Sequence, residues 1–148
     1  MRIALALVAL AWLAVLSRYD IAERRLPNLL TLPGAGVILL SGGLAGRGLP
    51  ALAGAAALTG AYLLVHLVAP TGMGAGDVKL AIGLGGLAGC FGVATWFLAA
   101  LAAPLLTALY GMVCRVRSVP HGPSMCLATA GACALHWRDV LISDLLYF

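Results

Sequence analysis

The chain has 148 residues, of which 63% are hydrophobic and only 9% are charged, whereas charged residues make up about a quarter of an ordinary soluble domain. This composition, with a mean hydropathy of +1.06, excludes a water-soluble globular fold. It also excludes intrinsic disorder, because a disordered chain needs low hydrophobicity and many charges. The net charge is +4, but the basic residues are scattered and form no patch of the kind that binds nucleic acid. The sequence therefore predicts an all-α, polytopic membrane protein whose surroundings are the lipid bilayer, with no nucleic-acid partner.

The charged residues divide the chain into its expected membrane spans, because a charge in the hydrocarbon costs a few kcal/mol and charges therefore collect at helix ends. A crossing needs about 20 residues, so the length allows about six short helices and no separate soluble domain. We expect a single membrane-embedded domain, 1–148. Its uncharged stretches are 3–17, 26–46, 48–76, 80–114 and 118–137.

The first stretch, 3–17, has two readings. It follows Arg2 and resembles a secretory signal peptide, yet no clean cleavage pattern of small residues appears before Arg18. We therefore interpret it as a helix that runs towards Asp20.

The stretch 80–114 is too long for one crossing, and we expect it to divide near Gly89 to Gly92. Glycines at this point either form a turn or permit tight helix packing. The last span is expected from about Ser124 to His136, with an amphipathic tail after it that is rich in aromatic residues. The total is six helices.

The Lys and Arg residues predict the orientation, since cytoplasmic loops carry the excess of positive charge. Three lie on the N-terminal side of the membrane, and six lie on the loops after the first, third and fifth spans: Arg18, Arg24, Arg25, Lys79, Arg115 and Arg117. The N-terminus is therefore expected outside, with the first loop in the cytoplasm.

Two of the five acidic residues are candidate catalytic groups. Asp20 ends the first span and Asp77 begins the fourth. Two crossings lie between them, so both are expected on the same face of the membrane. An aspartate at a membrane boundary is by default a functional candidate, although Asp20 could belong to a solvated loop and Asp77 could simply cap a helix.

The residues around Asp77 favour function. Gly74 and Gly76 precede it, and glycines allow the close backbone approaches that a substrate strand needs. Lys79 follows, and it either helps to orient Asp77 and bind substrate or marks the cytoplasmic side. Two neighbouring carboxylates cannot both ionise easily, so one keeps a proton while the other activates water. This is the chemistry of an aspartic protease.

The same residues resemble a known family. The segment from Gly74 to Leu80, GAGDVKL, is similar to the GxGDxKL motif of type IV prepilin peptidases, and the segment from Asp20 to Asn28, DIAERRLPN, is similar to their first aspartate motif. The residues Pro120–Ser124 resemble the proline-containing segment before their last helix only loosely. The GxGD motif is also shared in outline with the longer presenilin-like intramembrane proteases.

The resemblance implies that Asp20 and Asp77 form the catalytic pair. From the residues themselves we expect Gly74, Gly76, Lys79 and Glu23 to support the pair or position the substrate, with Glu23 meeting the positive charge of the leader. The expected reaction is cleavage of the leader peptide from type IV or Flp-type prepilins and pseudopilins, at the cytoplasmic face of a bacterial inner membrane. Larger members carry an N-terminal methyltransferase domain with CxxC motifs. The four cysteines here show no CxxC spacing, so a peptidase-only member is expected, serving tight-adherence (Flp) pili and protein secretion, with no cofactor and no metal.

Two alternatives belong to other classes. A small proton- or cation-coupled transporter or channel subunit also needs membrane acids, but it is expected to place them near the bilayer midplane in broken helices. A noncatalytic pilus-assembly protein would keep the fold without the activity, and the presence of both aspartates argues against it. The sequence carries no signal for an oligomeric state.

Overall fold

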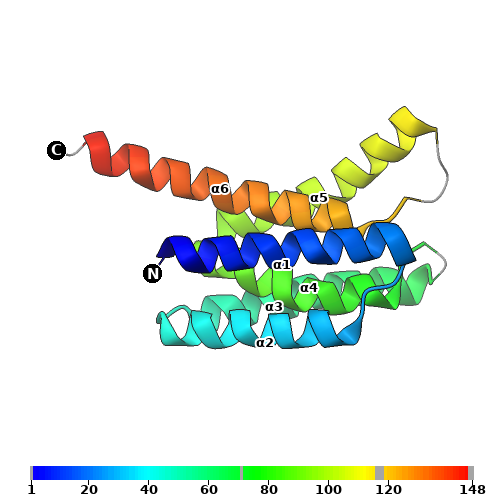
Figure 1. Cartoon of the computed structure of the whole chain (residues 1–148), viewed down its shortest axis with the longest axis horizontal. Helices are drawn as coiled ribbons and strands as arrows, with labels where there is room; N and C mark the ends of the chain where they lie inside the picture. Colours follow the sequence, from blue (N-terminus) through cyan, green and yellow to red (C-terminus); the bar gives the residue numbers. More distant parts are fainter. Residues whose placement is uncertain (1, 71, 116–118, 147–148) are drawn as a thin grey trace.

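The computed structural model describes residues 2–70, 72–115 and 119–146, which fold into helices and contain no strand. The prediction of an all-α chain with six helices is confirmed. In chain order they are α1 (Arg2–Glu23), α2 (Asn28–Leu44), α3 (Gly48–Val68), α4 (Ala75–Phe91), α5 (Val93–Cys114) and α6 (Gly122–Leu146) (Figure 1).

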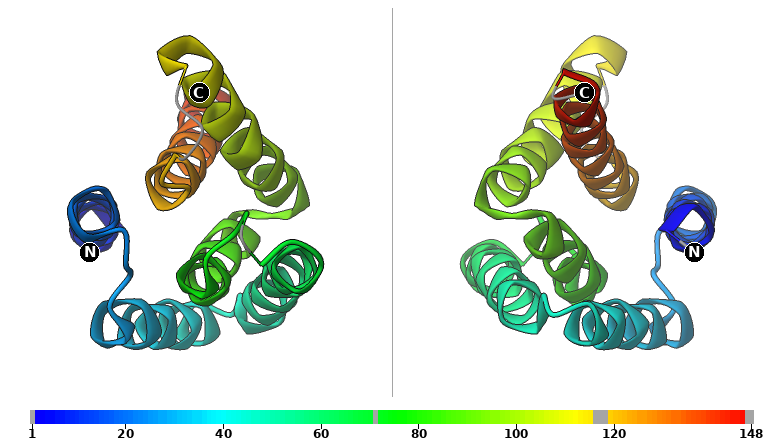
Figure 2. Two further views of the ribbon diagram at one scale, coloured as in Figure 1. Left: turned by 90° about the vertical axis from the view of Figure 1, so that its right-hand side faces the viewer. Right: turned by 90° about the vertical axis from the view of Figure 1, so that its left-hand side faces the viewer.

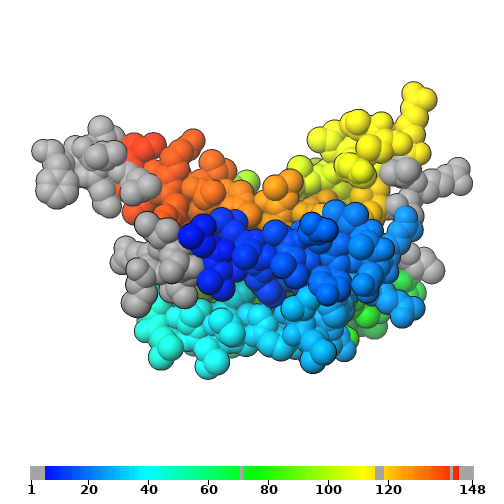
Figure 3. Space-filling view, viewed as in Figure 1, coloured from blue at the N-terminus to red at the C-terminus, as the bar shows by residue number. Residues whose placement is uncertain are grey.

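Helix α4 is the centre of the bundle. It packs against α2, α3, α5 and α6, whereas α1 packs mainly against α6. The end-on views of Figure 2 show α4 enclosed by its neighbours and α1 at the periphery. In the space-filling view, α1 lies across one face, between α6 and α2 (Figure 3). One polar bond joins α1 to α2, from Trp12 Nε1 to the carbonyl oxygen of Leu30 at 2.9 Å.

The contact between α3 and α4 depends on glycines. A Cβ added to Gly85 would lie 2.5 Å from the carbonyl oxygen of Gly54 and 2.8 Å from Leu58 Cβ, so a side chain there is excluded by the neighbouring backbone. Trp96 of α5 closes over the same place and donates from Nε1 to the Gly54 carbonyl at 3.0 Å. Small residues thus let two helices approach closely where lipid offers no hydrophobic driving force between them.

The division of the long apolar stretch falls at Gly92, within the expected range. Gly92 has a φ of +113° and separates α4 from α5, a backbone region that residues with a side chain rarely adopt. Helix α6 begins at Gly122 and continues to Leu146. The expected last span and its tail are therefore one continuous helix.

The apolar surface is consistent with a membrane setting. Helices α3 and α5 are long and apolar enough, by length and composition, to cross a bilayer, and α2 is a shorter apolar helix. Large hydrophobic side chains are exposed over most helices, among them Leu29, Leu40, Leu64, Val68, Leu101 and Leu105. Soluble monomers rarely expose this many large apolar side chains, and a lipid bilayer accounts for them.

Candidate active site

The ends of α1, α3 and α5 and the starts of α2, α4 and α6 lie at one end of the bundle. The first turns of α1 and the last turns of α6 lie at the opposite end (Figure 1). Asp20 is in the last turn of α1 and Asp77 is in the first turn of α4. The expectation that both aspartates lie on one side therefore agrees with the fold.

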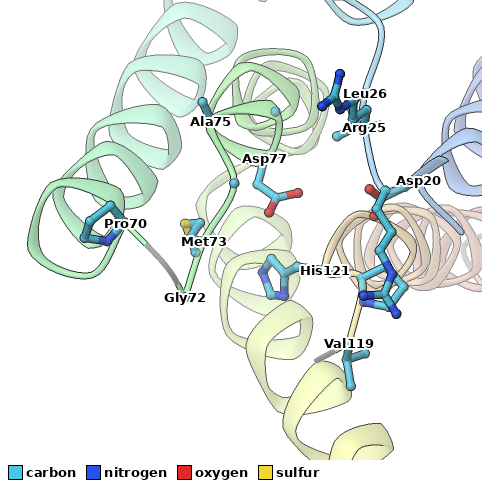
Figure 4. Close-up of a pocket in the computed structure, with 14 residues that line it drawn as sticks. Asp20, Arg25, Leu26, Pro70, Gly72, Met73, Ala75, Asp77, Val119 and His121 are labelled. Atoms are coloured by element: carbon cyan, nitrogen blue, oxygen red, sulfur yellow. The ribbon is translucent and has the colours of Figure 1, made fainter. Parts of the chain in front are cut away.

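Both aspartates line one pocket, with a volume of about 400 Å³. In Figure 4 their side chains extend into the same space from two helices, and His121 lies beside them. The two residues are 57 positions apart in the chain, and the packing of α1 and α4 around α6 brings them together. The pocket is lined by Asp20, Arg24, Arg25, Leu26, Pro70, Gly72, Met73, Gly74, Ala75, Gly76, Asp77, Val119, Pro120 and His121.

Asp77 is held by the start of its own helix. It is the third residue of α4, and its carboxylate accepts a hydrogen bond from the backbone N–H of Gly74, the N-cap. In return, the Asp77 N–H donates to the Gly74 carbonyl at 3.1 Å. An acidic side chain that reaches back to the N-cap also interacts favourably with the positive end of the helix dipole. The orientation of Asp77 is thus fixed locally by the glycine loop.

Asp20 is held by a different helix. Its Oδ2 accepts a hydrogen bond of 3.0 Å from the backbone N–H of Gly122, the first residue of α6. A Cβ at position 122 would fall 2.6 Å from that oxygen, so only glycine lets the helix start approach the carboxylate this closely. Each aspartate therefore faces the positive end of a helix, Asp77 that of α4 and Asp20 that of α6.

Both aspartates lie in terminal helical turns beside the pocket, outside the two apolar helices α3 and α5. Burial, and to a smaller extent the charge of Asp20, raise the pKa of Asp77 to about 6, against the opposing effect of the Gly74 N–H. Burial likewise raises the pKa of Asp20, against the Gly122 N–H. A carboxyl pair that retains a proton up to about pH 6 can act as acid and base on a shared water.

His121 is a pocket residue that the sequence did not single out. Its Nε2 lies 2.9 Å from Tyr62 Oη and its Nδ1 lies 2.6 Å from Thr107 Oγ1. Burial lowers the pKa of His121, so the imidazole is neutral at pH 7. The sequence feature that could have pointed to His121 is the loosely matching segment Pro120–Ser124, because it leads into the last helix on the side of the aspartates.

The supporting residues divide into two groups. Gly74 and Gly76 line the pocket, where Gly76 sits close to Leu26: an added Cβ would lie 3.3 Å from Leu26 Cβ. Lys79 and Glu23 are not among the lining residues. Lys79 Nζ instead donates to Asn28 Oδ1 at 2.9 Å, which joins the two aspartate motifs, and Glu23 is exposed.

The first aspartate motif ends at a helix start. Pro27 is the N-cap of α2, and Asn28 is the first helical residue. Within the described ranges, no group of three or more His, Cys, Asp or Glu residues is placed to hold a metal ion.

The fold and the pocket together define an all-helical membrane protein with a pair of aspartates at one end of its bundle. The model of the type IV leader peptidase family matches residues 7–112, which include both aspartate motifs. The chain belongs to this family and is a prepilin peptidase-like hydrolase. No curated protein and no solved structure shows a significant match to the chain.

Proposed function

We propose that the protein is an aspartic endopeptidase that removes the leader peptide from type IV or Flp-type prepilins, with Asp20 and Asp77 as its catalytic pair. One observation carries the proposal: two carboxylates from distant parts of the chain line a single pocket. Family membership supports prepilins as the substrates. It also favours a peptidase over a transporter or channel subunit.

The chemistry follows from one shared proton. The ionised carboxylate takes a proton from a water molecule as that water attacks the peptide carbonyl, and the protonated partner donates to the developing oxyanion. A proton then passes to the leaving amine as the C–N bond breaks. The aspartates titrate as a coupled pair, so the initial proton belongs to both.

The glycine loop before α4 supplies the place for the substrate strand. Gly72, Gly74 and Gly76 line the pocket beside Asp77, and the absence of side chains there allows an extended peptide to approach the main chain. The helix starts that hold the aspartates fix their oxygens before the substrate arrives. Such preorganisation contributes more to catalysis than a site that must reorganise during the reaction.

The pocket is proposed to face the cytoplasm, from a multi-pass position in a bacterial inner membrane. Arg24 and Arg25 line it, and Lys79 lies at the same end of the bundle, which supports this orientation by the excess of positive charge. A scissile bond at this face lies where the leader joins the apolar helix of a membrane-inserted pilin.

The test is cleavage of a co-expressed pilin precursor by the intact protein, Asp20→Asn and Asp77→Asn. Asp139→Asn is the matched control, because Asp139 is exposed and pairs with Arg138 at 3.0 Å, outside this pocket. A gel shift and N-terminal sequencing would identify the cut. We expect cleavage by the intact protein and the control, and a loss of at least about a thousandfold in each pocket variant at equal membrane levels.

Cleavage that survives either pocket substitution removes that aspartate from the mechanism. If the intact protein cuts none of several pilins, the peptidase proposal fails and the noncatalytic or transport alternatives gain support.

A further inference from the structure

His121 is connected to Asp20 through the next residue of the chain, Gly122. It is the residue immediately before Gly122, whose N–H donates to the Asp20 carboxylate. The His121 ring is anchored on two other helices, at Tyr62 of α3 and Thr107 of α5. The placement of the α6 start, and with it the hydrogen bond to Asp20, therefore depends on how this ring is held.

The hydrogen bonds around the ring have one consistent direction. Thr107 Oγ1 lies 3.1 Å from the carbonyl oxygen of Ala103 and 2.6 Å from His121 Nδ1, and its one proton can go to only one of them. We assign this proton to the carbonyl oxygen, which can only accept, so that Thr107 Oγ1 accepts from a protonated Nδ1. Because burial keeps the imidazole neutral, Nε2 carries none and accepts from the Tyr62 hydroxyl.

The resulting chain runs from Tyr62 O–H to His121 Nε2, from His121 Nδ1–H to Thr107 Oγ1, and from Thr107 O–H to the Ala103 carbonyl. Every proton in it has one acceptor. Tyr62 is buried, and His121 and Thr107 are half-buried, so breaking one bond leaves a poorly hydrated polar group without a partner. A fully satisfied chain of this kind favours one arrangement of the groups that it joins.

We propose that His121 is a positioning residue for the peptidase reaction: held as its Nδ1–H tautomer between Tyr62 and Thr107, it fixes the start of α6 so that the Gly122 N–H orients the Asp20 carboxylate. The proposal rests on the function proposed above. It assigns Tyr62 and Thr107, which lie on helices outside both aspartate motifs, a part in the geometry of the catalytic pair. None of the three residues takes or gives a proton in the reaction itself.

The kinetic test compares Thr107→Val with Thr107→Ser. Valine nearly matches the shape of threonine but cannot accept from Nδ1–H, whereas serine keeps the hydroxyl. With purified protein and prepilin in detergent, we expect Thr107→Val to lower kcat roughly tenfold, about the value of one positioning hydrogen bond, with KM unchanged. Thr107→Ser should restore most of the wild-type kcat. Equal kcat values for the two variants overturn the proposal.

The spectroscopic test does not require activity. The chain contains three histidines, and ¹⁵N NMR of histidine-labelled protein distinguishes the two tautomers, with His121→Gln identifying the signal. We expect the Nδ1–H form in the intact protein and in Thr107→Ser, and a shift towards the Nε2–H form in Thr107→Val.

An Nε2–H signal for His121 in the intact protein overturns the inference, even if leader cleavage is found. An Nδ1–H signal in a protein that cuts no prepilin supports the hydrogen-bond chain and places the failure with the proposed function instead.

Discussion

The first turn of α4 and the remainder of that helix are stabilised in different ways. The first turn carries Asp77, opens onto the pocket and is held by polar bonds to the glycine loop. From Leu80 onwards the same helix is buried among four others, and glycines let α3 lie against it. The packing of the scaffold therefore depends on the absence of side chains, whereas the site depends on polar groups that other segments bring to the helix start.

The largest loss of stability is predicted at the contact between Gly85 of α4 and Gly54 of α3. Gly85→Ala places a Cβ against the Gly54 carbonyl, a backbone atom that cannot rotate away. We expect the free energy of unfolding to fall by about 3 kcal/mol, seen as a lower unfolding temperature in detergent. Gly60→Ala is the control, because Gly60 lies on α3 with nothing within 4 Å of an added Cβ. Equal stability of the two variants would show that the packing of α3 on α4 does not require glycine.

A second glycine, Gly122, lies at the active-site end of the bundle, where it contacts Asp20. In Gly122→Ala the new Cβ meets Asp20 Oδ2, which is the end of a side chain and can turn away. We therefore expect the fold to survive while the Asp20 carboxylate loses its N–H partner and its orientation, with kcat for leader cleavage lowered roughly 30-fold. The matched control is Gly131→Ala on the same helix, where no atom lies within 4 Å. Unchanged cleavage by Gly122→Ala would contradict the assignment of the α6 start to Asp20.

The smallest change in activity is predicted for substitutions at Lys79 and its partner Asn28. Its hydrogen bond to Asn28 is exposed, and exposed bonds contribute little. If Lys79 only joins the two motifs, Lys79→Gln and Asn28→Ala should each lower the cleavage rate less than about threefold. A much larger loss in Lys79→Gln than in Asn28→Ala would instead show that Lys79 contacts the substrate.

Sequence patterns predicted the helices well because the free-energy cost of placing a charged group in the hydrocarbon limits where charges can occur along the whole chain. The charges marked the helix ends, and the glycines near Gly92 marked the division of the long apolar stretch, which the structure confirms. Two helix ends differ from the expected ones: α4 begins at Ala75, two residues before Asp77, and α6 continues without a break from the expected span through the expected tail to Leu146.

The site was predictable only in part. Counting the crossings placed Asp20 and Asp77 on one side, but it could not show which third segment holds Asp20. That contact joins Asp20 to a residue 102 positions away, and it depends on where the start of α6 packs. His121 was missed for the same reason, since its partners Tyr62 and Thr107 lie on two other helices with no shared sequence motif.

The most direct test of the shared pocket is a pH titration of Asp77 in the intact protein and in Asp20→Asn. NMR monitors the titration in protein whose aspartates carry ¹³C at the carboxyl carbon. We expect one carboxyl with a pKa of about 6 in the intact protein, its signal absent in Asp77→Asn. In Asp20→Asn the charge that raises this pKa is gone, so the titration of Asp77 should move to lower pH. It should remain above the ordinary value of 3.8 because burial persists. An Asp77 titration that is the same in the intact protein and in Asp20→Asn would contradict the claim that the two carboxylates act as one pair.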